Sequence, residues 1–401
     1  MNSKQPFFSI VIPTKNRPEY LRDSIQSVLL QDFTDYELIV SDNFNETPTE
    51  KVLEEFRSHS KVRVFRTPKE LSMIDHWEFA TKKVKGEYVI LLADRKLLYQ
   101  GALKKIKVEV LKNPEVQAFS FRSKIYDDEN KKMGWQALEH KTKVYQSSEL
   151  IENFLNTNYY SLESLDFMFP KTLNGCYKNN LAKKAREITG RYFDNEGVTT
   201  PDYSSLFINL ALTERVMHIG QKIMLWQGEK TSNGRQFGKG KYKAYMSTLN
   251  LHDPYVNVPI KAPFTYNLLI VDFLSIKELF GGNLTQHNIN YNNYLYTIYW
   301  ELLTKSEFDM DVEDLNYFKR EFEEGLAACE SKEHTFSKNQ TEFQFKVPVL
   351  QNRFDKFFNF RKHLRDYVTN RFPNSKIANK VLKTHYKSSL HAAGFDVNFS
   401  D

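Results

Sequence analysis

The chain has 401 residues, of which 41% are hydrophobic and 14% aromatic, so it can bury a sizeable core and is not disordered as a whole. Its two cysteines, Cys176 and Cys329, lie far apart without CxxC spacing, which excludes a disulfide scaffold or thiolate metal site and is typical of a reducing compartment. The net charge of +6 is uneven, because residues 346–387 carry eleven lysines and arginines against two acids. That segment is therefore +9, and the rest of the chain is −3.

The N-terminal segment lacks the basic and apolar regions of a secretion signal, and no run approaches 18 uninterrupted apolar residues. We therefore expect a cytoplasmic protein without a membrane span.

Strand-like and helix-like patterns alternate over the first 125 residues, which predicts an α/β fold with a mostly parallel sheet flanked by helices. Pro13 is expected to end the first strand, Asn16 to cap the first helix, and a Thr-Pro-Thr-Glu capping box to open the second. The predicted strands are residues 7–12, 36–41, 62–65, 88–92 and 116–121, and a helix is predicted over 72–83.

Two carboxylates follow different strands of this predicted sheet. Asp42, with Asn43 beside it, comes at the end of the second strand, and Asp94 follows the strand at 88–92. In open α/β sheets the ligand lies beyond the carboxyl ends of the strands, so these side chains are candidates for a binding site.

The rest of the chain is less regular from 126 to 240, becomes aromatic-rich and helical from 241 to 330, and turns polar at 331–345. We therefore predict a first domain over 1–240, a helical extension over 241–330, and a linker with a basic C-terminal region over 331–401.

The first 240 residues contain, in order, the segments FFSIVIPTKNRPEYLRDSIQSVLLQDFTDYELIVSDN, LSMIDHWE followed by GEYV, and PDY and GEKTSNG. In order and spacing, these segments resemble the inverting family 2 glycosyltransferases of GT-A fold, of the bacterial surface-polysaccharide type. Such enzymes move a sugar from a nucleotide-sugar donor to a hydroxyl group of a glycan or lipid-linked glycan.

The resemblance assigns roles along the chain. Pro13 and Thr14 would form the wall of the nucleotide pocket, and Asp42 would accept a hydrogen bond from the base or ribose. Asp202, in PDY, would be the catalytic base, although an Asp before an apolar run is also typical of a helix cap. The remaining candidates are Asn43 and Asp75 on the donor side, and Asn174, Gly175, Ser232 and Asn233 on the acceptor side, where ordinary turns are the alternative.

The sequence departs from the family where several acids normally bind a metal. Here Asp94 is followed by Arg95 and Lys96, and adjacent cations repel Mg²⁺ or Mn²⁺. We expect an enzyme that needs no metal or binds one weakly, with Arg95 or Lys96 neutralising the leaving diphosphate. Three alternatives stay open: loss of the donor site, cations that point to solvent, and a metal site completed by Asp75.

The basic segment 346–387 alternates cations with aromatic and aliphatic residues. This pattern suits a helix at a membrane surface, and packing on the protein is an equal alternative. The aromatic segment 264–303 suits a helical extension or a dimer contact, and no nucleic-acid motif accompanies the charge.

The leading interpretation is sugar transfer by single displacement to a bacterial surface glycan. A catalytically silent GT-A-like module in a glycan-assembly complex is the first alternative. A nucleotidyltransferase is the second, and the absence of a Gly-rich loop after the first strand argues against it.

Overall fold

A computed structural model describes nine stretches of the chain: residues 5–44, 47–133, 141–156, 168–193, 197–227, 242–248, 253–307, 312–330 and 393–395. The predicted linker, the basic segment 346–387, and the acceptor-side residues Ser232 and Asn233 lie outside these stretches.

The first half of the described sheet is parallel, as predicted from the alternating pattern. Its strands follow the order β3-β2-β1-β4. The expectation that Pro13 ends β1 is wrong, because the strand continues through Pro13 to Thr14, which pairs with Asp42. The bounds are β1 (Phe8–Thr14), β2 (Tyr36–Asp42), β3 (Val62–Arg66) and β4 (Tyr88–Leu91).

The second half of the sheet is mixed and continues in the order β9-β6-β10-β5. Strand β9 is antiparallel to both β4 and β6, whereas β10 runs parallel to β6. Strand β10 is the longest described strand, and the less regular sequence pattern of residues 126–240 did not predict it. The bounds are β5 (Lys96–Leu98), β6 (Ala118–Asp127), β7 (Lys132–Met133), β8 (Lys143–Gln146), β9 (Gly175–Lys178) and β10 (Arg215–Trp226).

One face of the sheet is covered by α1 (Pro18–Leu29), α2 (Thr47–Phe56) and α4 (Ala102–Lys112). The side chains of β1 alternate, so that Ile10 and Ile12 pack against these helices while Val11 packs on the opposite face. The cap expected at Asn16 is wrong. Asn16 has a left-handed φ of 51°, and Arg17 occupies the N-cap position without a side-chain cap bond.

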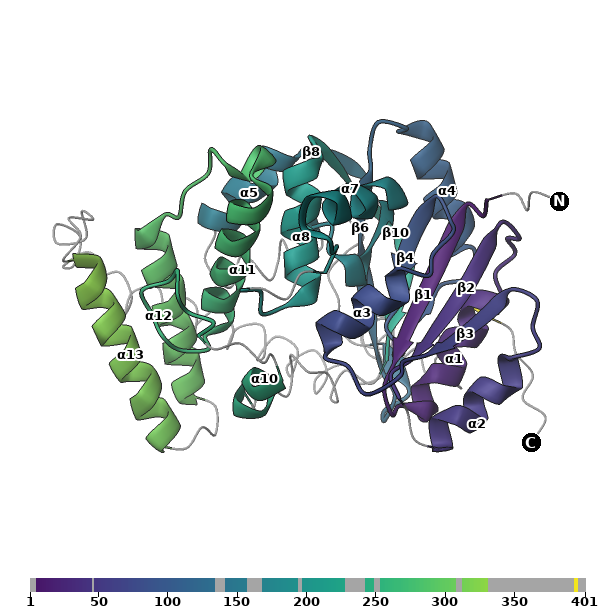
Figure 1. The fold of residues 1–401 in the computed structure, drawn as a ribbon, viewed down its shortest axis with the longest axis horizontal. Helices are drawn as coiled ribbons and strands as arrows, with labels where there is room; N and C mark the ends of the chain where they lie inside the picture. The colour runs from purple at the N-terminus through teal and green to yellow at the C-terminus, as the bar shows by residue number, and fades with distance from the viewer. Residues whose placement is uncertain are drawn as a thin grey trace, which may run out of the picture.

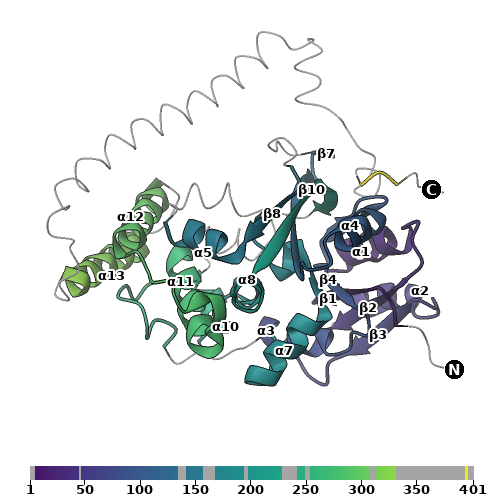
Figure 2. The same cartoon turned by 90° about the horizontal axis from the view of Figure 1, so that it is seen from above.

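The other face carries α3 (Met73–Thr81), α5 (Ser147–Asn156), α7 (Asn179–Thr189) and α8 (Pro201–Leu212). Ser72 caps α3 by accepting a hydrogen bond from the backbone N–H of Asp75. Figure 2 shows α3 and α7 on the side of the strands opposite α1 and α4.

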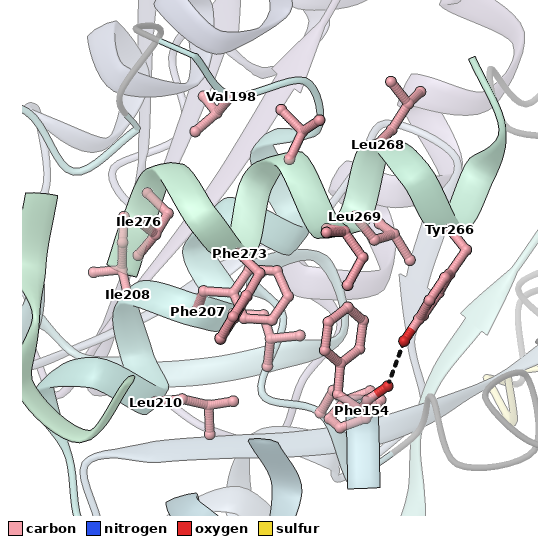
Figure 3. Packing of buried hydrophobic residues seen from close by; sticks show 14 of the residues in the cluster. Phe154, Val198, Phe207, Ile208, Leu210, Tyr266, Leu268, Leu269, Phe273 and Ile276 are labelled. Carbon is pink, nitrogen blue, oxygen red and sulfur yellow. Dashed lines mark hydrogen bonds between the residues drawn. The ribbon is translucent and has the colours of Figure 1, made fainter. Parts of the chain in front are cut away.

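The predicted helical extension is present and shares this second core. Phe273 of α11 packs on Phe154 of α5 and Phe207 of α8, and the Tyr266 hydroxyl donates to the carbonyl oxygen of Phe154 (Figure 3). No helix in the described ranges is long and apolar enough to cross a bilayer. The helices are α10 (Tyr242–Thr248), α11 (Thr265–Phe280), α12 (Tyr291–Glu307) and α13 (Val312–Glu330), with α13 farthest from the sheet in Figure 1.

A buried carboxylate fastens this extension to the segment before α8. Asp272 of α11 is fully buried and accepts hydrogen bonds from the backbone N–H and hydroxyl groups of both Thr199 and Thr200. Thr200 is the N-cap of α8, so α11 determines where that helix begins. Burial raises the pKa of Asp272 to about 7, although the four donors favour its ionised form.

The variant Asp272→Asn tests this connection. The side-chain amide of the variant would place its own N–H groups against the donors of Thr199 and Thr200. The free energy of unfolding should therefore fall by about 1–3 kcal/mol at about pH 5. The wild-type pKa lies above the value of about 3.9 in unfolded chains, so Asp272 contributes less stability as pH rises from about 4 to 7. Denaturant titrations should therefore show a smaller difference at about pH 8. An equal difference at both pH values would contradict a titrating Asp272.

Candidate functional site

Thr14 contacts both of the predicted carboxylate residues, Asp42 and Asp94. Thr14 is the last residue of β1 and pairs in register with Asp42, the last residue of β2. Its hydroxyl donates to Asp94 Oδ2 over 3.0 Å. Asp42 is 2% exposed and Asp94 3%, so the structure brings these predicted residues to one edge of the sheet.

Both oxygens of Asp94 have hydrogen-bond donors. Thr14 binds Oδ2, and the guanidinium of Arg17 binds Oδ1 at 3.3 Å. Burial raises the pKa of Asp94, and the positive charges of Arg17 and Arg95 only partly oppose that shift.

These surroundings do not fit a divalent cation. A metal at Asp94 would displace a donor from its carboxylate and would lie beside two guanidinium groups. Asp75 does not complete a site either, because its Oδ1 forms a 2.6 Å ion pair with Arg191. Among the described residues, no group of three His, Cys, Asp or Glu side chains is arranged to hold a metal.

The two cations after Asp94 point into the protein rather than to solvent. Arg95 is 8% exposed and Lys96 4%, and both lie over the ring of Trp226, at 5.7 and 5.2 Å from its centre. Lys96 Nζ also donates to the carbonyl oxygen of Leu173, at 3.1 Å, and to Asn174 Oδ1. Lys96 thus connects the donor side to the segment that carries Asn174.

Asn174 and Gly175 lie in regular structure, not in a flexible loop. Asn174 ends the 3₁₀ helix η2 (Thr172–Asn174), and Gly175 begins β9. The Asn174 side chain accepts from Lys96 and from Ser123. A Cβ at position 175 would come within 2.6 Å of two backbone carbonyl oxygens, so only glycine fits without rearrangement.

Asn43, a predicted donor-side residue, and His76, which the sequence did not single out, hold the backbone near Asp42. The Asn43 amide donates to the carbonyl oxygen of Leu71 and accepts from its N–H, both at 2.9 Å. His76 Nε2 lies 2.9 Å from Ser41 Oγ, and burial lowers the pKa of His76 to about 4, so its ring is neutral at pH 7. These residues support the strand end.

Asp202 is the second residue of α8 and not its cap, since the N-cap is Thr200. A carboxylate in the first turn is favourable for the helix dipole. The next residue, Tyr203, lies beneath Lys171 Nζ at 4.6 Å, and Lys171 directly precedes η2. Lys96 contacts η2, and Lys171, directly before η2, contacts the first turn of α8. A continuous series of contacts therefore connects Lys96 to the helix turn that carries Asp202.

Sequence reasoning missed Arg17 and Trp226. Arg17 follows the first strand in the run Thr14-Lys15-Asn16-Arg17, and its side chain is 29% exposed, which makes it more accessible than Arg95 or Lys96. The position of a cation shortly after the end of a predicted strand could have identified Arg17 as a site residue. Trp226 gave no such signal, because it lies more than a hundred residues from the cations it contacts.

Solved structures of S. aureus TarS are similar to this chain. One TarS structure is 14% identical with a TM-score of 0.44, covering 74% of this chain and 48% of that chain, so this chain spans about half of it. TarS 1-349 in complex with UDP is 14% identical (TM-score 0.45, 79% of this chain and 88% of that chain). TarS 1-349 in complex with UDP-GlcNAc is 12% identical (TM-score 0.46, 78% and 79%).

A sequence family matches the part of the chain that carries Asp42 and Asp94. Residues 9–169, from β1 to the segment before η2, match the family described as Glycosyl transferase family 2. The N-terminal part of this chain is therefore similar to glycosyltransferases of family 2 over residues 9–169, which include the parallel strands β1 to β4.

Proposed function

We propose that the protein transfers a sugar from a nucleotide-sugar donor to a hydroxyl group of a bacterial surface glycan, with inversion at the anomeric carbon. The observation that carries the proposal is the junction of Asp42, Thr14 and Asp94 at the carboxyl edge of a family 2 domain. The surface-glycan acceptor rests on the resemblance of the PDY and GEKTSNG segments, of which the second lies outside the described residues.

The nucleotide-sugar would bind at this strand edge. Asp42 would accept a hydrogen bond from the base or ribose, beside the wall formed by Pro13 and Thr14. Arg17 is the most accessible cation beside Asp94, so it would contact the diphosphate. Arg95 and Lys96 lie deeper and would add positive potential behind it.

The reaction would be a single displacement. The acceptor hydroxyl gives its proton to Asp202 while its oxygen attacks the anomeric carbon, and the bond from that carbon to the diphosphate oxygen breaks. Cationic side chains would stabilise the charge that develops on the departing nucleoside diphosphate. No step requires a metal ion.

The protein would act in the cytoplasm, at the inner face of the cell membrane if the acceptor is linked to a lipid. The basic segment 346–387, outside the described residues, would supply peripheral contact with anionic lipids.

The variant Asp202→Asn tests the base. Loss of the Asp202 carboxylate should lower kcat by about 10²–10⁴-fold, while calorimetry should show that the affinity for the donor is unchanged. The matched control is Asp32→Asn, whose side chain is 89% exposed in an ion pair with Lys104. Unchanged turnover would remove Asp202 from the mechanism. A wild type that binds donor without any transfer or hydrolysis would instead favour the catalytically silent module.

The variant Arg17→Ala tests the accessible cation. Loss of a charged contact should weaken binding of the nucleoside diphosphate about tenfold or more in calorimetry. Arg22→Ala is the control, because Arg22 lies on α1 and forms an exposed ion pair with Glu55. Equal affinities of both variants and the wild type would exclude Arg17 from the diphosphate site.

Chelation tests the poor fit for a metal. Transfer should continue in EDTA, since cationic side chains already face the carboxylate that would otherwise bind the ion. The measurement is the rate of donor turnover, for UDP-, GDP-, dTDP- and CMP-sugars, with EDTA or with added Mn²⁺. Complete inhibition that Mn²⁺ reverses would overturn the metal-free mechanism.

A further inference from the structure

A cavity of about 1170 Å³ lies in the helical extension, away from the strand edge. Its walls come from α10, from the segment at 254–263, and from the first turns of α13. The volume exceeds the range of about 300–1,000 Å³ that is usual for small-molecule sites. It therefore has room for more than one sugar ring.

The lining combines aromatic rings with the carboxylate of Asp314, which hydrogen bonds hold in position. Tyr242, Tyr255 and Tyr317 contribute three rings. Asp314 Oδ1 accepts hydrogen bonds from the Tyr242 hydroxyl at 2.8 Å and from Lys243 Nζ at 2.6 Å. This group is fixed at the cavity wall, because Asp314 is 8% exposed.

The charges of the lining balance, since Lys243 and Arg320 match Glu313 and Asp314. A strongly anionic ligand would therefore gain little net attraction, and an apolar ligand would cover charged groups at a cost. Sugars present apolar C–H faces that pack on aromatic rings and hydroxyl groups that bond to charged side chains. The lining therefore matches a glycan best.

Helix α10 joins this cavity to the acceptor side of the site. Tyr242, Lys243 and Met246 of α10 line the cavity. Tyr245 of the same helix donates from its hydroxyl to the carbonyl oxygen of Thr199 at 2.6 Å, three residues before Asp202. In Figure 1, α10 lies below α8 and α11, between the sheet and the outer helices.

We propose that this cavity is a second carbohydrate-binding site, which holds an oligosaccharide segment of the acceptor several units from the reacting hydroxyl. That the bound oligosaccharide belongs to the acceptor rests on the function proposed above, whereas carbohydrate binding at the cavity does not. Occupation of this site would let the enzyme prefer an oligosaccharide acceptor over a single sugar, because contacts far from the reacting hydroxyl keep the acceptor bound.

The test uses the full chain and three probes, namely tetrasaccharides of N-acetylglucosamine, of glucose and of galactose. Binding is measured by calorimetry and by saturation-transfer NMR, without donor. Asn316→Trp places a bulky side chain in the cavity wall. Its matched control is Lys319→Trp, an exposed position on the same helix outside the lining.

At least one tetrasaccharide should bind the wild type, and its affinity should fall about tenfold or more in Asn316→Trp but not in Lys319→Trp. Circular dichroism spectra and thermal unfolding should match the wild type in both variants, which shows that both are folded. Absence of binding by all three probes, or equal loss in both variants, would overturn the proposal. Binding by a protein that never turns over a donor would keep this site and reject the proposed function.

Discussion

The hydroxyl of Thr14 joins the end of β1 to Asp94 beyond β4, and the proposed donor site depends on this contact. Parallel pairing of β1 with β2 places Thr14 beside Asp42, and the side chain of Thr14 reaches Asp94 beyond β4. Three strands that are distant in sequence thereby contribute to one edge. Asp42 lies on β2, whereas Asp94 lies in the turn between β4 and β5, where Thr14 and Arg17 hold its buried carboxylate by hydrogen bonds.

Charge is arranged around this junction in two layers. Arg17, in contact with Asp94, remains partly accessible, whereas Arg95 and Lys96 are enclosed next to Trp226. Enclosed cations act at longer range because water screens them less. Lys96 also donates to Asn174, so the cation cluster has a structural role that connects β5 to the 3₁₀ helix η2.

Hydrophobic periodicity predicted the parallel strands, the helical extension and the strand-end position of Asp42 and Asp94. Those features depend on local pattern and on the edge rule for α/β sheets. It did not predict β10, which runs parallel to β6 about a hundred residues away, or the contact between Trp226 and Arg95. Such features depend on tertiary neighbours. The expected cap at Asn16 failed for a local reason, because Asn16 adopts a left-handed backbone conformation in the turn between β1 and α1 and Arg17 is the N-cap.

The boundary predicted near residue 240 does not divide the core. Phe154, Phe207 and Phe273 pack together across it, and Asp272 holds the threonines that open α8 (Figure 3). A chain cut near residue 240 would therefore leave one side of a shared hydrophobic core uncovered and would remove the carboxylate that holds the start of α8.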